Sequence, residues 1–362
     1  MWTAGSTRWG SEQHVSQAPY QALLFLSFGG PEGHDDVMPF LRNVTRGRGV
    51  PAERLETVAE HYHAFGGISP INRQNRALIA ALGQEFATHG VDLPIYFGNR
   101  NWKPYVADAV RRMRDDHVKR ALVFATSATA SYSACRQYRD DLAQARQVAG
   151  DGAPELVKLR HYFDHPGFIA ANVDHVRSAL DTLPAAERDT ARLVFTAHSI
   201  PTAMNDLSGP EHNGLYRAQH YDTARLVTAL VRGVDADFDL VWQSRSGPPQ
   251  VPWLEPDINE HLKALAGQGT RAVVVCPTGF VSDHVEVVWD LDIEARATAT
   301  ELGMHFVRAA TAGAHPGFVT AVRELVEERL SGAQPKALGT LGLCGIDCPT
   351  GCCPAPRRGA AR

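Results

Sequence analysis

The chain has 362 residues, of which 44% are hydrophobic and 21% are charged, and its formal net charge is −4. This composition is typical of a soluble globular protein with two domains of ordinary size. The slightly negative charge argues against nucleic acid or an anionic membrane as a partner. No segment approaches the roughly 18–20 consecutive apolar residues that a transmembrane helix needs.

Residues 1–18 are polar and lack the apolar core of a signal peptide. We interpret them as a flexible N-terminal extension. Without a secretion signal we expect a cytoplasmic, reducing location. Cysteines that cluster in such a compartment serve more often as metal ligands than as disulfides.

Eight short apolar runs predict strands, and most of them are continuous rather than alternating, as in parallel sheets buried on both faces. They lie at 22–28, 94–97, 121–125, 156–160, 193–196, 240–242, 272–276 and 304–307. Amphipathic segments between them predict helices at 75–88, 106–116, 165–183 and 222–231. This alternation indicates right-handed βαβ units.

The eight strands divide into two sets of four. We therefore predict an α/β fold with two Rossmann-like domains, each a four-stranded parallel sheet flanked by helices. The first domain spans 19–163 and is completed by 310–332, because a helix at 316–331 returns to it, and the second domain spans 164–309. Ligands of open parallel sheets bind beyond the carboxyl ends of the strands, which predicts a site in the cleft between the domains.

The end of one strand presents His198, where a neutral imidazole can accept a proton or ligate a metal. A histidine that only forms hydrogen bonds at a domain boundary is the alternative. A helix expected to begin near Ser282 carries Glu286, Asp290 and Glu294 at every fourth residue, so three carboxylates line one helix face. Like charges at that spacing repel, which favours a metal or proton path over a capping box with a solvated face.

Two further loops are weaker candidates. The glycines after the first strand, in Ser-Phe-Gly-Gly-Pro at 27–31, do not follow the G-x-G-x-x-G pattern, so dinucleotide binding is not supported. Arg46 and Arg48 form a small basic turn. Guanidinium groups match carboxylates bidentately, although a solvated loop is the commoner case.

Four of the six cysteines crowd into the Cys-rich segment at 333–362, namely Cys344, Cys348, Cys352 and Cys353. Thiolates select zinc, copper(I) or iron–sulfur clusters, so this tail predicts a metal site. A reduced tail without metal is the alternative. A ligand from Cys135 would attach the tail to the body of the protein, whereas Cys276 ends a buried strand and is expected to belong to the core.

Six segments occur in an order and spacing that resembles the ferrochelatase family, in particular its soluble actinobacterial type, over about residues 20–330. They lie at 26–31, 65–72, 195–201, 241–244, 252–254 and 280–286. The resemblance implies a lyase of haem biosynthesis that inserts Fe(II) into a porphyrin, held in a cleft between the domains, and releases two protons.

In the relatives that the chain resembles, the substrate is coproporphyrin III and the product is coprohaem. Insertion into protoporphyrin IX, a chelatase for another metal, and a non-catalytic tetrapyrrole-binding or iron–sulfur sensor protein are the alternatives.

The resemblance also implies roles for individual residues. His198 abstracts pyrrole protons or receives iron, and Glu286 pairs with it from the opposite domain, across the porphyrin plane. Asp290 and Glu294 match the outer acids of the same helix, which guide metal in or protons out. Glu32 stands where many soluble relatives have a metal-ligating tyrosine, so axial ligation from this position is not implied.

Positions that hold propionates or line the pocket in relatives correspond here to Arg46, Arg48, Ser69 and Arg100. Some members of the family, actinobacterial ones included, carry a [2Fe–2S] cluster on one internal cysteine and three in a C-terminal extension. The resemblance implies the ligands Cys135, Cys344, Cys348 and Cys353, with Cys352 as the alternative tail ligand. A zinc ribbon in the tail stays open, and we expect a monomer.

Overall fold

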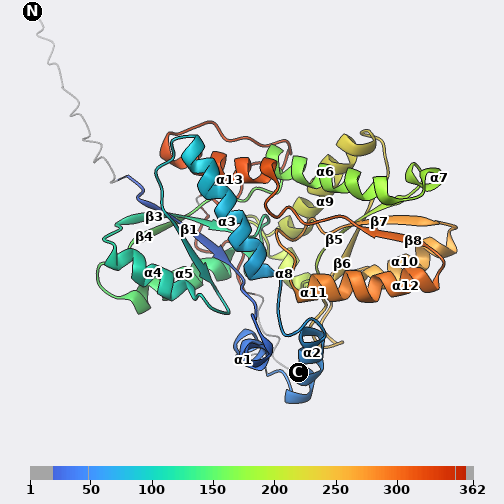
Figure 1. Cartoon of the computed structure of the whole chain (residues 1–362), viewed down its shortest axis with the longest axis horizontal. Coiled ribbons are helices and arrows are strands. Elements are labelled where there is room, and N and C mark those ends of the chain that lie inside the picture. The colour runs from blue at the N-terminus through green and yellow to red at the C-terminus, as the bar shows by residue number, and fades with distance from the viewer. Residues whose placement is uncertain (1–18, 48, 347, 356–362) are drawn as a thin grey trace, which may run out of the picture.

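The computed structural model describes residues 19–47, 49–346 and 348–355. It contains two four-stranded sheets, with strand orders β2-β1-β3-β4 and β6-β5-β7-β8, and all pairs are parallel. Helices flank both sheets, which lie next to each other along the long axis of the molecule (Figure 1). The predicted α/β fold with two four-stranded parallel sheets is thus confirmed. The N-terminal extension at 1–18 lies outside the described residues.

The first sheet forms because its strands are continuous apolar runs, and each overlaps a predicted run. All residues of β1 are buried, since helices cover both faces of the sheet. The elements of this half are β1 (Ala22–Ser27), α1 (His34–Val44), α2 (Ala52–Ala64), α3 (Ile71–Thr88), β2 (Ile95–Asn99), α4 (Val106–Asp115), β3 (Arg120–Ala125), the π-helix η1 (Tyr132–Arg136), α5 (Gln137–Ala149) and β4 (Glu155–Lys158).

The second sheet repeats this plan, and its strands also overlap the predicted runs. Its elements are α6 (Pro166–Thr182), α7 (Ala185–Arg188), β5 (Arg192–His198), α8 (Thr202–Asp206), α9 (Leu215–Arg232), β6 (Asp239–Gln243), α10 (Ile258–Gly267), β7 (Ala272–Cys276), α11 (Val285–Val287), the π-helix η2 (Val288–Ala295), α12 (Arg296–Glu301) and β8 (His305–Arg308). No helix in the described part of the chain is long and apolar enough to span a membrane.

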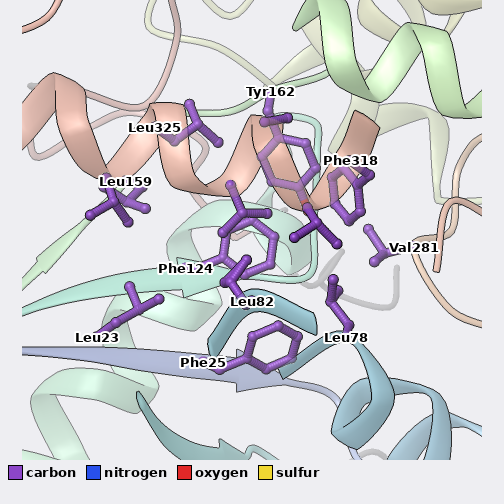
Figure 2. Packing of buried hydrophobic residues seen from close by; sticks show 14 of the residues in the cluster. Leu23, Phe25, Leu78, Leu82, Phe124, Leu159, Tyr162, Val281, Phe318 and Leu325 are labelled. Carbon is purple, nitrogen blue, oxygen red and sulfur yellow. The ribbon is translucent and has the colours of Figure 1, made fainter. Parts of the chain in front are cut away.

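The last helix, α13 (Pro316–Leu330), packs on the core of the first sheet although it follows the second sheet in sequence. Its Phe318 joins Phe25, Phe124 and Tyr162 in one buried cluster (Figure 2). The helix also lies against α6. A Cβ atom on Gly167 of α6 would lie 2.1 Å from the carbonyl oxygen of Gly317, so this close crossing requires glycine. The two helices therefore hold the two halves together.

Helices α1 and α2 form a small lobe beyond the carboxyl end of the first sheet, seen at the bottom of Figure 1. Phe40 and Tyr62 of this lobe pack with Trp102 and with Val285 of α11, which belongs to the second half. This contact places α2 opposite the segment that carries the candidate acids.

Candidate functional site

His198 is the last residue of β5, at the edge of the sheet where parallel strands present their carboxyl ends. Its Nδ1–H donates to the carbonyl oxygen of Ser199, so the neutral ring has its lone pair on Nε2. Nε2 lies 3.7 Å from Oε2 of Glu286, and the two side chains are 34% and 46% exposed. An accessible base and an accessible carboxylate thus face each other, and together they can share one proton.

The prediction that Glu286 approaches His198 from the opposite domain is wrong. Both residues belong to the second half, because α11 follows β7 and β7 is hydrogen-bonded to β5. A flat ring between the two side chains would need a gap of about 7 Å, twice the van der Waals contact distance. At 3.7 Å the two groups can only address the same face of a planar ligand.

The loop after His198 is held rigidly by its neighbours. The hydroxyl of Tyr216 donates to the carbonyl oxygen of His198 at 2.8 Å, and Ser199 Oγ donates to the carbonyl oxygen of Leu254 at 2.8 Å. Tyr216 stacks on the buried Trp242 at a ring-centroid distance of 5.8 Å. These contacts fix the imidazole position, so the site is preorganised.

Asp290 lies on the π-helix η2, and it is the acid with the most perturbed ionisation. Burial, together with the negative charges of Glu286 and Glu294, raises the pKa of Asp290 to about 7. Hydrogen bonds from Ser244 Oγ and Gln243 Nε2 oppose this rise. A carboxyl group with a pKa near 7 can take up and release protons at neutral pH.

The backbone around Asp290 is unusual on both sides. Ser244 has a left-handed φ of 61°, rare for a residue other than glycine, and this conformation directs its hydroxyl at Asp290. The regular α-helix predicted from near Ser282 is not observed, since α11 begins at Val285 and continues as a π-helix. π-Helical turns occur frequently at functional sites.

Glu294 is oriented by Trp289, whose Nε1–H donates to Glu294 Oε1 at 2.8 Å. The neighbouring Asp292 serves a different purpose, because it is paired with Arg308 at 2.8 Å. The helix therefore separates its acids into one set that is paired with cations and another, Glu286, Asp290 and Glu294, that has no basic partner except His198 within the described residues.

Helix α2 covers this acidic segment from the first half. The ring of His61 stacks on Trp289, with centroids 3.8 Å apart and planes 8° apart. Burial lowers the pKa of His61, while Glu294 and Glu286 act in the opposite direction. Burial, together with the charge of Glu286, also raises the pKa of Tyr62 well above its usual value. The sequence offered no signal for these contacts between the two halves.

Five cysteines converge at the other functional region. Cys135, Cys344, Cys352 and Cys353 form one buried cluster, and Cys348 packs against it. The thiols of Cys348 and Cys353 lower the pKa of Cys135 by hydrogen bonding to its thiolate. Cys276 is a core residue at the end of β7, as expected, and burial raises the pKa of its thiol.

The cysteine tail is attached to both halves of the protein. His161 N–H donates to the carbonyl oxygen of Cys344 at 2.8 Å, and Arg136 donates to that of Thr350 at 2.7 Å. In the second half, the N–H of Gly209 donates to Cys353 Sγ at 3.2 Å. Ordinary hydrogen bonds therefore already position the tail.

The cysteine cluster offers thiol donors without a metal-binding arrangement in the described part of the chain. No three His, Cys, Asp or Glu side chains among the described residues are arranged to hold a metal ion. Five thiols nevertheless gather there, and the buried ring of His161 lies beside Cys135. The imidazole interacts with the Cys135 thiol, and burial lowers the pKa of His161. The donor types that iron–sulfur clusters and zinc require are thus present, without a metal-binding arrangement among the described residues.

Comparison with known proteins matches residues 20–330 to the ferrochelatase family. The chain belongs to this family. It is 58% identical to the coproporphyrin III ferrochelatase of Nocardia farcinica over 348 residues, which cover 94% of this chain and 98% of that protein. The coproporphyrin III ferrochelatase of Streptomyces coelicolor is 56% identical, with 96% and 97% covered.

Among solved structures, SirB from Bacillus subtilis with Fe3+ aligns with a TM-score of 0.51. The alignment covers 87% of this chain and 97% of that one, at 10% sequence identity. At so low an identity the likeness concerns the fold alone.

The residues expected to hold propionates in this ferrochelatase are placed very differently from one another. Arg46 is exposed after α1 and has no ion pair within the described residues, while Arg48 lies outside them. Ser69 is only 2% exposed. The guanidinium of Arg100 is buried and paired with Asp141, so a propionate would have to displace that carboxylate.

Glu32, which stands in place of a tyrosine, is engaged by Arg76 through both carboxylate oxygens. Its side chain is therefore committed to a surface ion pair. Two residues of the site escaped assignment, although the segment at 241–244 belonged to the resemblance: Gln243 and Ser244 both contact Asp290. Their polarity directly after a buried strand was the available signal.

Proposed function

We propose that the protein inserts Fe(II) into coproporphyrin III to form coprohaem, releasing two protons, in haem biosynthesis. The observation that carries the proposal is the pair His198 and Glu286, 3.7 Å apart and accessible, at the head of a line of acids on η2. Membership of the ferrochelatase family and the names of the closely similar relatives support the same reaction.

In the proposed mechanism, His198 is the base for the pyrrole protons. Porphyrin N–H groups are very weak acids, so their removal needs a base in contact with the ring. The Nε2 lone pair of His198 accepts a proton, and the adjacent carboxylate of Glu286 stabilises the resulting imidazolium. Asp290, with its pKa of about 7, then takes the proton, and Glu294 passes it towards solvent. The same line of acids attracts the ferrous substrate.

The first half would provide the opposite wall of the binding site. Phe28 and Ile68 are large apolar side chains that remain 38% and 51% exposed. A planar apolar porphyrin would bury both side chains. The free energy gained by this burial would offset the cost of distorting the porphyrin ring, which exposes the lone pairs of its nitrogen atoms. Arg46, and Arg48 beyond the described residues, are the proposed propionate partners.

Anaerobic insertion of Fe(II) into coproporphyrin III and protoporphyrin IX, compared side by side, tests the proposal. We expect faster insertion into coproporphyrin III by the wild type and a loss of about 10²–10⁴-fold in His198→Ala, with porphyrin binding retained. Preference for protoporphyrin IX would overturn the substrate assignment. Porphyrin binding without insertion by the wild type would overturn the enzymatic proposal in favour of a binding or sensing protein.

We propose further that the tail holds a [2Fe–2S] cluster through Cys135, Cys344, Cys348 and Cys353, with Cys352 as the alternative to Cys353. The gathering of five thiols from two distant parts of the chain supports this assignment. Such a cluster would cross-link the tail to the body of the protein, and insertion chemistry does not need it.

Iron, sulfide and zinc analysis of the anaerobically purified protein tests the cluster. We expect about two irons and two sulfides per chain, a red-brown colour, and loss of both in Cys353→Ser but not in Cys352→Ser. One zinc in a colourless protein would identify a zinc site instead. We place the reaction in the cytoplasm and propose a monomer, which sedimentation of the purified protein tests.

A further inference from the structure

The strand β4 leaves one edge of the first sheet open. It pairs with β3 on one side only. Glu155 N–H donates to the carbonyl oxygen of Lys119 and Leu159 N–H to that of Val123, at 2.8 and 2.9 Å. Because successive N–H groups of a strand point to opposite sides, those of Leu156 and Lys158 point away from β3. In the described part of the chain neither has a hydrogen-bond partner.

A groove of about 480 Å³ runs along this edge. Side chains of β4 alternate between two walls: Leu156 packs with the cluster that includes α5, and Val157 packs with the cluster that includes α13. Ile346 of the cysteine tail also lines the groove. An extended segment added to β4 would therefore have a helix on each side.

The groove carries unbalanced positive charge on both walls. Arg139 and Arg146 come from α5, Arg329 from α13 and Lys158 from β4 itself. None of the four forms an ion pair with a carboxylate among the described residues, and the one acid of the lining, Glu155, is paired with Arg120 at 2.9 Å.

Lys158 is only 8% exposed, and its ammonium donates to the carbonyl oxygen of Leu159 at 3.4 Å. It also faces the thiols of Cys135, Cys344 and Cys348, whose negative charge would stabilise it. The cations of the groove that remain available to a partner are therefore the three arginines of its walls.

We propose that the open edge of β4 binds an extended acidic segment of a partner protein by strand addition. Backbone hydrogen bonds to an exposed edge supply affinity in this mode of recognition, and alternate side chains supply specificity. In an added strand, alternate acidic side chains would meet arginines on both walls. Residues 1–18 contain one acid and residues 356–362 contain three arginines and no acid, so neither stretch has the acidic composition that the groove favours.

Fluorescence anisotropy with the full-length protein tests the proposal. The probe is a labelled, acetylated octapeptide of alternating valine and glutamate, with the valine–lysine peptide as its control. We expect binding of the acidic peptide only, weakened about tenfold or more in the double variant Arg146→Glu/Arg329→Glu. The matched control Arg177→Glu, on the exposed surface of α6, should bind normally.

The variant Leu156→Pro distinguishes peptide binding by strand addition from peptide binding by charge attraction alone. Proline removes the outward N–H and leaves the β3 ladder intact, and it is tolerated on edge strands. We expect this variant to lose the peptide. Its melting temperature should fall because Leu156 packs against the cluster that includes α5, so peptide binding and iron insertion are measured at a temperature at which the variant is folded, where insertion should stay close to wild type. Normal peptide binding by Leu156→Pro, no binding by the wild type, or displacement of the peptide by citrate or pyrophosphate at equal concentration would each overturn the proposal.

Discussion

The acid–histidine site and the cysteine tail are both rich in metal donors, yet they are built in opposite ways. His198 ends β5 and Glu286 lies on α11, which follows the adjacent strand β7, and the two side chains remain 34% and 46% exposed. Cys135 and Cys353 come from distant parts of the chain and are 2% and 1% exposed. Exposure suits groups that must release what they bind, whereas burial suits groups that retain it.

The two regions also differ in how their charges are compensated. Burial and, to a smaller extent, the neighbouring acids raise the pKa of Asp290 to about 7, so it holds its proton until about neutral pH. The tail instead has its carbonyl groups satisfied by Arg136 and His161 of the body. The acids of the first region repel one another, and a bound cation or proton relieves this repulsion. The cysteine tail contains little electrostatic repulsion of this kind. We therefore expect mutations in the first to act on rate and mutations in the second to act on stability.

After His198→Ala, the largest effect is expected from Glu286→Gln. The amide keeps the shape but cannot stabilise an imidazolium on His198, so iron insertion should fall by about 10²–10³-fold. Anaerobic stopped-flow absorbance measures the rate. Glu301→Gln, which removes an acid from α12, is the matched control and should be active. Equal rates for the two variants would show that Glu286 is not part of the proton path.

Cys135→Ser should produce the next largest effect, on stability and not on rate. Loss of the internal thiol removes the proposed attachment between the tail and the body, at a cost of about 2–4 kcal/mol by analogy with a lost cross-link. Thermal melting should show a decrease of several degrees, and limited proteolysis should cleave the tail. An insertion rate more than tenfold below wild type would contradict the separation of the two regions.

Asp290→Asn should change rate and stability in opposite directions. The folded-state pKa is raised to about 7 from an ordinary 3.8, so the folded protein binds the extra proton and loses stability as pH rises from about 4 to 7. At pH 8 the neutral amide avoids that cost, and we expect stabilisation of about 1–2 kcal/mol. Insertion should fall about tenfold because the relay is interrupted. If Asp290→Asn were less stable than wild type at pH 8, the ionised carboxylate of Asp290 would have to be stabilised by its hydrogen bonds in the folded protein.

Much of this site was predictable because its signals are local. The strand ends follow from apolar runs, and the spacing of Glu286, Asp290 and Glu294 indicates a shared face in either helix type. The π-helical form of η2 and the left-handed Ser244 were not predictable, because both depend on packing around Asp290.

The wrong and missing predictions concern relations between distant segments. Glu286 was placed opposite His198 by the role that the resemblance implied, although the predicted second domain at 164–309 already contains both residues, and the pairing of β5 with β7 brings them together. The assignment of Arg100 to propionates stays a prediction, and its pairing with Asp141 on α5 could not be read from the sequence. The stacking of His61 on Trp289 joins the two halves of the protein. Hydrophobic periodicity predicts helices and strands but does not predict how two halves pack against each other.

The smallest effect is expected from Ser244→Ala, and it tests how finely the acidic region is tuned. The Ser244 hydroxyl lowers the pKa of Asp290, so its removal should raise that pKa above about 7. The acid limb of the pH–rate profile should then move to higher pH, by about half a unit if the lost hydrogen bond contributes about 0.7 kcal/mol. The insertion rate at pH 9 should be unchanged, because Asp290 is ionised there in both proteins. A uniform decrease at every pH would instead mean that Ser244 only supports the backbone of the loop.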